Sequence, residues 1–357
     1  MSNIYIIGRV VGNYRTQNLI KFLLDQDFKV CFNFQENRSL FVKVIKRLFS
    51  IVFILQADIV IMPAMCNIHQ FELRVAHFFR KRIIVDFYLS LYDTMILDRL
   101  AFNKESKKAK DFLLFDRRCV DYASDLFFLN NSEARYYLEL IGRSGVKNFK
   151  IIPLCIEQKV KCQLPYFRKS SKTLNICWWG SYIPLHGLDL ILDAALILKN
   201  KDSINVHFYL FGNDSSKSKL YENFIAKNQL SSQVTVDNSY TFNNGKLEPF
   251  LANHCDLVLG SFGKSLKAKT VLVNKLVDGI AMKAPILSGY TKGAQEFFTD
   301  DDIFFADNDP NEIANRIIEV SKVSEKSIDA KVDRAYEKYL KYFSTQSYFE
   351  SMKAVIG

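Results

Sequence analysis

Short apolar segments alternate with longer amphipathic segments along most of this 357-residue chain, in two successive series. The short segments are continuously apolar, which is typical of parallel strands buried on both faces. Parallel strands need a crossover connection, and here helical patterns occupy the intervals between them. The expected strands are Ile4–Ile7, Lys29–Phe34, Asp58–Met62, Arg82–Phe87, Asp125–Leu129, Lys150–Leu154, Leu174–Trp179, Val206–Phe211, Val234–Val236, Asp256–Leu259, Ala284–Ser288 and Ile303–Ala306. The sequence therefore predicts an α/β protein with two Rossmann-like, doubly wound domains.

A polar, lysine-containing stretch interrupts the alternation near the middle of the chain. It predicts a first domain over residues 1–156, a linker over 157–173 and a second domain over 174–335. A polar, aromatic-rich helical segment, 336–357, closes the chain. Two such domains in series are expected to face a central cleft, where ligands of this architecture usually bind.

The positive charge lies mainly in the first half of the chain. The net charge is +10, and residues 1–155 hold 23 basic and 15 acidic residues, a net charge of +8. Such an excess favours a polyanionic partner, either membrane phosphates or nucleic acid. Recognition patterns for nucleic acid are missing from the sequence, so we expect no nucleic-acid partner.

The sequence signals for secretion, for a membrane span and for paired cysteines are all weak. The start lacks the pattern of a secretory signal, and the most apolar stretch, Ser50–Met65, is too short to span a bilayer. Seven scattered cysteines without a CxxC pair indicate reduced, mostly buried thiols. We therefore expect a soluble or monotopic protein in the cytoplasm.

A glycine-containing loop follows the first strand of the second series. Gly180, Ser181, His186 and Gly187 lie between this strand and an amphipathic helix. The N–H groups at such a helix start form an anion site suited to a diphosphate. An ordinary strand–helix loop with two turn glycines would have the same composition.

A second segment combines lysines with an amide and a carboxylate. Lys267, Lys269 and Lys275 follow a strand that ends in Gly260-Ser-Phe-Gly263. Asn274 and Asp278, four residues apart, share a helix face, and a carboxylate there could accept hydrogen bonds from ribose hydroxyls. The alternative is a solvated basic loop.

Together the two segments resemble retaining GT-B glycosyltransferases of glycosyltransferase family 4. GSYIPLHGLDLILDAA is similar to the donor-domain opening loop, and KAKTVLVNKLVDGIAMKAPIL is similar to a segment of a bacterial polysaccharide and lipopolysaccharide branch. VDFYLSLYDTMILDR and the final helix, 339–356, extend the resemblance over nearly the whole chain. It implies a nucleotide-sugar site in the second domain, an acceptor site in the first, and a final helix returning to the first domain. Glu296 matches an acidic position further along the same branch, which implies either a helix-start residue or a donor contact.

The departures from the family pattern concern charge. Thr270 stands where the first of two acidic residues is usual, and Asp278 replaces the second, a Glu. Ser181 and His186 stand where the family usually has Arg and Lys. We therefore expect Lys267, Lys269 and Lys275 to offset the charge of the leaving diphosphate, with Lys275 in a catalytic role.

Candidate residues in the first half are fewer. Asp86, at a strand's carboxyl end, is a candidate catalytic residue, although a buried Asp bonded to the backbone is equally consistent with the sequence. Gly12, Arg15 and Asp93 are candidate acceptor-binding residues. The first domain offers no His at the strand end where many relatives carry one.

No metal or other cofactor is expected. The five histidines form neither an H-x₃-H nor an HExxH pattern, and Asp300-Asp301-Asp302 is more simply a solvated turn. GT-B enzymes as a class work without an essential divalent metal.

Two basic-aromatic segments, FVKVIKRLF at 41–49 and FELRVAHFFRKR at 71–82, alternate apolar and cationic side chains. Helices on an anionic membrane leaflet have this pattern, as do helices that cover a sheet. With the charge excess, and the lipid-linked acceptors that the resemblance implies, the pattern favours a peripheral location on the inner face of the cytoplasmic membrane.

The function that the sequence predicts is transfer of a sugar, with retention, from a nucleotide-diphosphate sugar to a polyprenyl-diphosphate-linked or lipopolysaccharide, O-antigen or capsule glycan. Placement of the acceptor hydroxyl and charge compensation at the leaving group would supply catalysis. A non-catalytic, transferase-like subunit of a glycan-assembly complex is the main alternative. The second alternative is a sugar-nucleotide epimerase.

Overall fold

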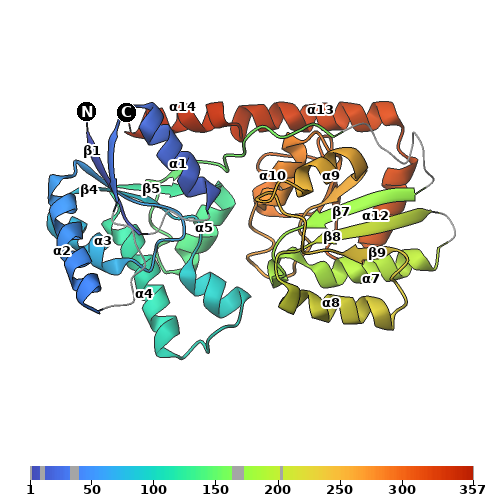
Figure 1. The fold of residues 1–357 in the computed structure, drawn as a ribbon, viewed down its shortest axis with the longest axis horizontal. Helices are drawn as coiled ribbons and strands as arrows, with labels where there is room; N and C mark the ends of the chain where they lie inside the picture. Colours follow the sequence, from blue (N-terminus) through green and yellow to red (C-terminus); the bar gives the residue numbers. More distant parts are fainter. Residues whose placement is uncertain (1, 9–12, 33–39, 163–172, 202–203, 357) are drawn as a thin grey trace. The chain divides into compact units, whose positions relative to one another are not determined.

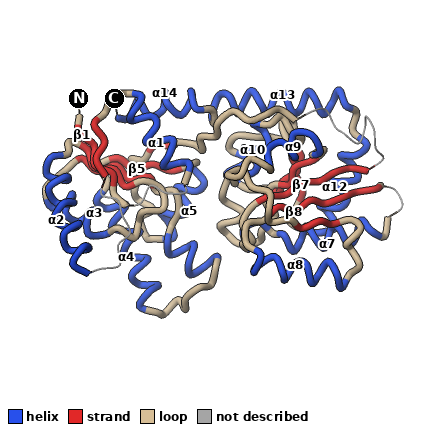
Figure 2. The backbone as a smooth tube through the Cα atoms, in the orientation of Figure 1, coloured by secondary structure: helices blue, strands red, loops and turns tan. Residues whose placement is uncertain are grey.

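In the computed structural model the chain forms two compact units. Unit 1 comprises Met1–Cys155 and Tyr348–Gly357, and unit 2 comprises Ile156–Ser347. The structure describes residues 2–8, 13–32, 40–162, 173–201 and 204–356. Each unit holds one parallel six-stranded sheet (Figures 1 and 2).

The sheet of unit 1 has the strand order β2-β1-β3-β4-β5-β6. Its strands are β1 (Asn3–Ile6), β2 (Lys29–Phe32), β3 (Ile59–Met62), β4 (Arg82–Asp86), β5 (Asp125–Phe128) and β6 (Lys150–Ile151). Its helices are α1 (Tyr14–Asp25), α2 (Leu40–Gln56), α3 (Gln70–Phe78), the π-helical turn η1 (Asp93–Asp98), α4 (Lys107–Tyr122) and α5 (Asn131–Leu140). All six strands lie where the apolar runs predict them, and the segment 150–154 pairs over a shorter length.

Successive side chains of these strands enter two separate cores, because a strand has a period of two. Ile4 and Ile6 pack with α1 and with Tyr348 and Met352 near the chain's end. Tyr5 joins the core on the opposite face, beneath α2 to α5. The sheet is therefore covered on both faces, as continuous apolar strands require.

The sheet of unit 2 has the order β12-β11-β10-β7-β8-β9. Its strands are β7 (Thr173–Trp179), β8 (Asn205–Phe211), β9 (Val234–Val236), β10 (Leu257–Leu259), β11 (Ile286–Gly289) and β12 (Phe304–Ala306). Its helices are η2 (Pro184–His186), α7 (Leu188–Lys199), α8 (Ser215–Lys227), α9 (Leu247–His254), α10 (Asn274–Ala281), α11 (Lys292–Gln295), α12 (Pro310–Lys322) and α13 (Glu325–Tyr342). The strand order reverses at β7, which lies between β10 and β8. Ligands of open α/β sheets bind at such a switch point, beyond the carboxyl ends of the strands.

The expected closing segment, 336–357, contains the end of α13 and a further helix, α14 (Thr345–Ile356). Residues 336–347 group with unit 2, and Tyr348 onward with unit 1. In unit 1, the α14 backbone accepts a hydrogen bond at Val355 from Arg82, and Phe349 packs edge-on against Phe22. Of the expected linker, 157–162 belongs to unit 2, and 163–172 lies outside the described residues.

Candidate active site

Two loops at the carboxyl edge of the unit 2 sheet pack backbone against backbone. Gly187 has a positive φ of 63°, and a Cβ atom added there would lie 2.5 Å from the Phe262 carbonyl carbon. The Phe262 N–H donates to the His186 carbonyl over 3.1 Å. Ser261 Oγ donates to the Leu185 carbonyl over 2.5 Å. The glycine loop after β7 is thus fixed against the loop after β10, at the switch point.

Lys275 is the most unusual residue of this site. It lies in the first turn of α10 and is only 4% exposed, yet its Nζ has no hydrogen-bond partner among the described residues. The ammonium lies 4.1 Å from the centre of the Trp178 ring. Burial lowers the pKa of Lys275 well below its ordinary value. Buried cations are normally paired, so this group lacks the anion that would stabilise its charged form.

Gly180 and His186 lie next to that ammonium. A Cβ atom on Gly180 would lie 3.3 Å from Lys275 Nζ and 3.4 Å from His186 Nε2. Gly180 has a φ of 145°, which favours glycine, so the approach to Nζ carries no side chain. Burial, and next the Lys275 charge, lower the pKa of His186 well below its ordinary value. Neutral His186 is then a hydrogen-bonding group rather than a cation.

Asp278 lies one turn after Asn274 on α10, and its side chain is buried while Asn274 is half-buried. Burial raises the pKa of Asp278 to about 7, and the Lys159 charge and the nearby Trp179 side chain oppose the rise. A carboxylate in this condition gains stability from ligand hydroxyl donors, because they replace the hydration it has lost.

The raised pKa of Asp278 makes stability depend on pH. The folded state holds this proton up to about pH 7, whereas the ordinary value is 3.8, so the free energy of unfolding falls as pH rises between these values. Asp278→Asn should remove that fall and be more stable than the parent at pH 8. Urea unfolding at pH 4 to 8 measures this, with exposed Asp333→Asn as the control. Parallel pH profiles for the parent and Asp278→Asn would contradict it.

The other predicted donor contacts differ in their exposure and in their hydrogen bonds. Ser181 Oγ accepts a hydrogen bond from Asn213 over 3.1 Å. Lys267 is buried and Lys269 exposed, on the turn that leads to α10, and Glu296 is exposed at the end of α11. The structure thus brings together Gly180, His186 and Lys275. The donor-binding and catalytic roles of all the predicted residues of this unit stay predictions.

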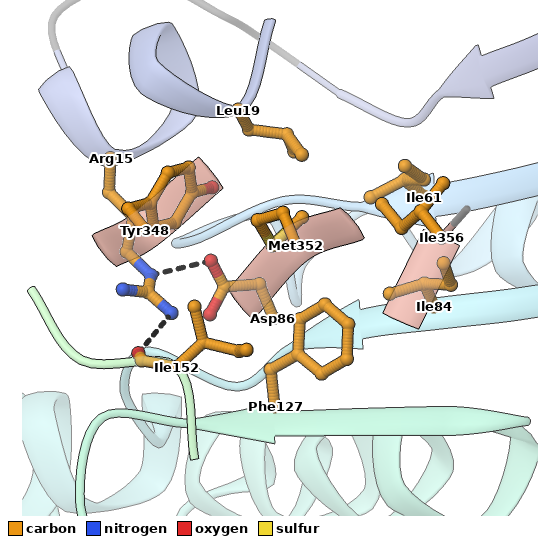
Figure 3. Close-up of a pocket in the computed structure, with 10 residues that line it drawn as sticks. All are labelled: Arg15, Leu19, Ile61, Ile84, Asp86, Phe127, Ile152, Tyr348, Met352 and Ile356. Carbon is orange, nitrogen blue, oxygen red and sulfur yellow. Dashed lines mark hydrogen bonds and ion pairs between the residues drawn. The ribbon is translucent and has the colours of Figure 1, made fainter. Parts of the chain in front are cut away.

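In unit 1, Arg15 and Asp86 form a buried ion pair (Figure 3). Arg15 Nε donates to Asp86 Oδ2 over 2.6 Å, and its two other nitrogens donate to the carbonyls of Pro153 and Ile152. Both side chains are under 10% exposed, and Tyr348 of α14 lies beside them. The adjoining cavity is about 10 Å³, enough for one water-sized probe. These contacts favour a structural role for Arg15, and the acceptor and catalytic roles stay predictions.

Of the two remaining unit 1 candidates, Asp93 and Gly12, the structure describes only Asp93. Asp93 begins η1 and accepts a 2.6 Å hydrogen bond from the Tyr136 hydroxyl. Gly12 lies outside the described residues.

Asp116, which the sequence analysis did not single out, organises the loop after β4. It accepts hydrogen bonds from Asn67, from Ser90 and from the N–H groups of Leu91 and Tyr92. Its only sequence signal is a carboxylate on the buried face of an amphipathic helix, α4.

Among the residues that the structure describes, no group of three or more His, Cys, Asp or Glu side chains could hold a metal ion. Within the same described ranges, no helix is long and apolar enough to cross a bilayer.

Part of unit 2 is similar in sequence to a known protein family. Residues 173–322, which contain the whole candidate donor site, match the family model for "Glycosyl transferases group 1". Over these residues unit 2 is therefore similar to group 1 glycosyltransferases. No curated protein matches the chain in sequence.

Solved structures extend the comparison to the whole chain. Anabaena Alr3699/HepE, in complex with UDP and glucose, is 14% identical with a TM-score of 0.69, covering 100% of this chain and 99% of that one. Sucrose-phosphate synthase from Thermosynechococcus elongatus is 11% identical with a TM-score of 0.74, over 100% and 98%. This chain has the GT-B fold. The lipopolysaccharide outer core galactosyltransferase WaaB, in its apo form, shares it at 12% identity and a TM-score of 0.65, over 100% and 99%.

Proposed function

We propose that this GT-B protein transfers a sugar, with retention, from a nucleotide-diphosphate sugar to a lipid-linked or lipopolysaccharide-type glycan. The observation that carries the proposal is the buried ammonium of Lys275, without a hydrogen-bond partner in the described chain, at the glycine loop of a unit that is similar to group 1 glycosyltransferases. A diphosphate at Gly180 would supply the missing counter-charge. Asp278 would hold the ribose hydroxyls.

In this proposal the residues act mainly by placement and electrostatics. The N–H groups at the start of α7 and the Lys275 ammonium would stabilise the charge that develops on the departing diphosphate. His186, neutral and beside Gly180, would act as a hydrogen-bonding group. Retention rests on the family resemblance and would be read from the anomeric configuration of the product by NMR.

The first test is a thermal-shift panel of UDP, GDP, CDP and ADP, each with and without EDTA. We expect one nucleotide to raise the melting temperature by several degrees, whether or not EDTA is present. Asp278→Ala should lose this rise. A transfer assay with that donor separates an enzyme from a binding subunit, because the latter would bind without forming product. A folded sample that responds to no nucleotide would contradict the proposal.

We further propose that the protein lies peripherally on the inner face of the cytoplasmic membrane, and an apolar groove on unit 1 supports this location. The α2–α3 groove has a volume of about 660 Å³ and is lined by Ile51, Phe71, Arg74, Val75, His77, Phe78, Phe79 and Tyr122. Phe78 is 78% exposed, and Phe49 on α2 is 54% exposed. Exposed Arg74 lines the groove together with these apolar side chains, a combination that fits an anionic phospholipid surface.

A double variant tests this surface. Phe49→Ser/Phe78→Ser should weaken binding to phosphatidylglycerol vesicles roughly 100-fold or more, because each Phe contributes about 1.5 kcal/mol or more when buried and about 1.4 kcal/mol is tenfold in affinity. Leu220→Ser is the matched control, since Leu220 is 72% exposed but lies on α8 of unit 2. Vesicle co-sedimentation gives the affinities. Equal binding by the double variant and the control would overturn the membrane assignment.

A further inference from the structure

The Lys275 ammonium lies over the face of the Trp178 ring in a cation–π contact. Trp178 is fully buried near the carboxyl end of β7, and Lys275 Nζ lies 4.1 Å from its ring centre. The face of an indole ring attracts a cation through its quadrupole, most strongly where water is excluded. Among the described residues Nζ has no hydrogen-bond partner, so we attribute the stabilisation of its charge to this ring.

The ring is itself held in place by other aromatic side chains. Tyr182 stacks on Trp178 with 5.9 Å between ring centres, and Tyr221 stacks on Tyr182 at 5.2 Å. The Tyr182 hydroxyl donates to Asn238 over 2.7 Å. Gly212 permits this packing, since a Cβ atom there would lie 2.0 Å from the Tyr182 hydroxyl oxygen. The position of Trp178 therefore does not depend on a ligand.

The neighbour of the Lys275 ammonium is an aromatic ring and not a carboxylate, and this difference affects what the ammonium can bind. A carboxylate partner would neutralise Lys275 and occupy its N–H donors. A ring face accepts no conventional N–H···O bond and carries no net charge, so it leaves both the N–H donors of Lys275 and its counter-charge to a ligand. The absent side chain at Gly180 leaves an approach to Nζ.

We propose that Trp178 is a positioning residue that holds Lys275 Nζ beneath Gly180, ready to bind the diphosphate of the donor. The inference rests on the proposed function and adds to it the residue that sets the affinity for the diphosphate. It does not concern the nucleoside part of the ligand.

Substitutions at Trp178 test the inference through the contrast between UDP and uridine. By calorimetry, UDP affinity should fall a few-fold in Trp178→Phe, which keeps a ring, and at least about tenfold in Trp178→Leu. Uridine affinity should stay within about twofold in both. Phe208→Leu is the matched control, because Phe208 is fully buried in the same core on β8. If the two Trp178 variants bind UDP as tightly as the Phe208→Leu control, the inference is overturned. It is also overturned if they lose affinity for UDP and for uridine equally.

Fluorescence gives a second readout that survives if Trp178→Leu does not fold. The chain has two tryptophans, so Trp178 is the only tryptophan in Trp179→Phe, and excitation where tyrosine does not absorb selects its emission. UDP should change this emission, because the diphosphate attracts the Lys275 ammonium and so alters the electric field at the ring. Uridine should not change it, and Lys275→Met should abolish the response. An unchanged emission in a variant that binds UDP would reject the role of Trp178. If the parent binds neither UDP nor another nucleoside diphosphate, the proposed function itself fails.

Discussion

Lys275→Met should weaken binding of the donor nucleotide by roughly 10- to 100-fold and at the same time make the protein more stable. Binding weakens because a charge-assisted hydrogen bond to phosphate, worth about 1.5–3 kcal/mol, is lost. Stability rises because folding buries this cation without an anionic partner, and replacing it with an apolar chain of similar length removes that desolvation cost. A gain of about 1–4 kcal/mol in the free energy of unfolding is expected.

Isothermal titration with the nucleotide identified by the thermal-shift panel and urea unfolding measure the two effects. Lys227→Met, an exposed lysine on α8, should change neither. A structural lysine would give lower stability with unchanged affinity, which is the reverse of the expected result. If Lys275→Ala and Lys269→Ala both leave turnover within about twofold of the parent, neither lysine offsets the leaving charge.

The second large effect concerns the ion pair of unit 1. Asp86→Asn leaves the Arg15 guanidinium buried without its counter-charge, and we expect a loss of about 3–5 kcal/mol in the free energy of unfolding. The double variant Arg15→Met/Asp86→Leu should recover a large part of that loss, because both charges are removed together. The exposed Lys283–Asp333 pair is the control, and Asp333→Asn should cost under about 1 kcal/mol.

The same variants separate a structural Asp86 from a catalytic one. A structural residue predicts that activity per folded molecule persists in the double variant. Loss of turnover in Asp86→Asn with unchanged stability would instead support the catalytic role predicted from its place at the end of β4.

The order of strands along the chain could be predicted from the sequence, because each buried parallel strand needs a continuous apolar run and each crossover needs a helical pattern. Segments such as Val234–Val236 coincide with their strands. Pairing partners and exact lengths could not be predicted, since they depend on hydrogen bonds between distant segments. The run 150–154, for example, pairs only at Lys150–Ile151.

For the candidate site, the sequence by itself determined which loops carry glycine, lysine and carboxylate, since these residue types follow strands that end at one edge. The tertiary structure decided which of those groups share an environment. It buried Lys275 against Trp178 and left Lys269 exposed, although the two lysines are only six positions apart in one segment. It also paired Arg15 with Asp86, 71 positions away. A charge pattern records composition along the chain, whereas desolvation and pairing depend on atoms that only folding brings together.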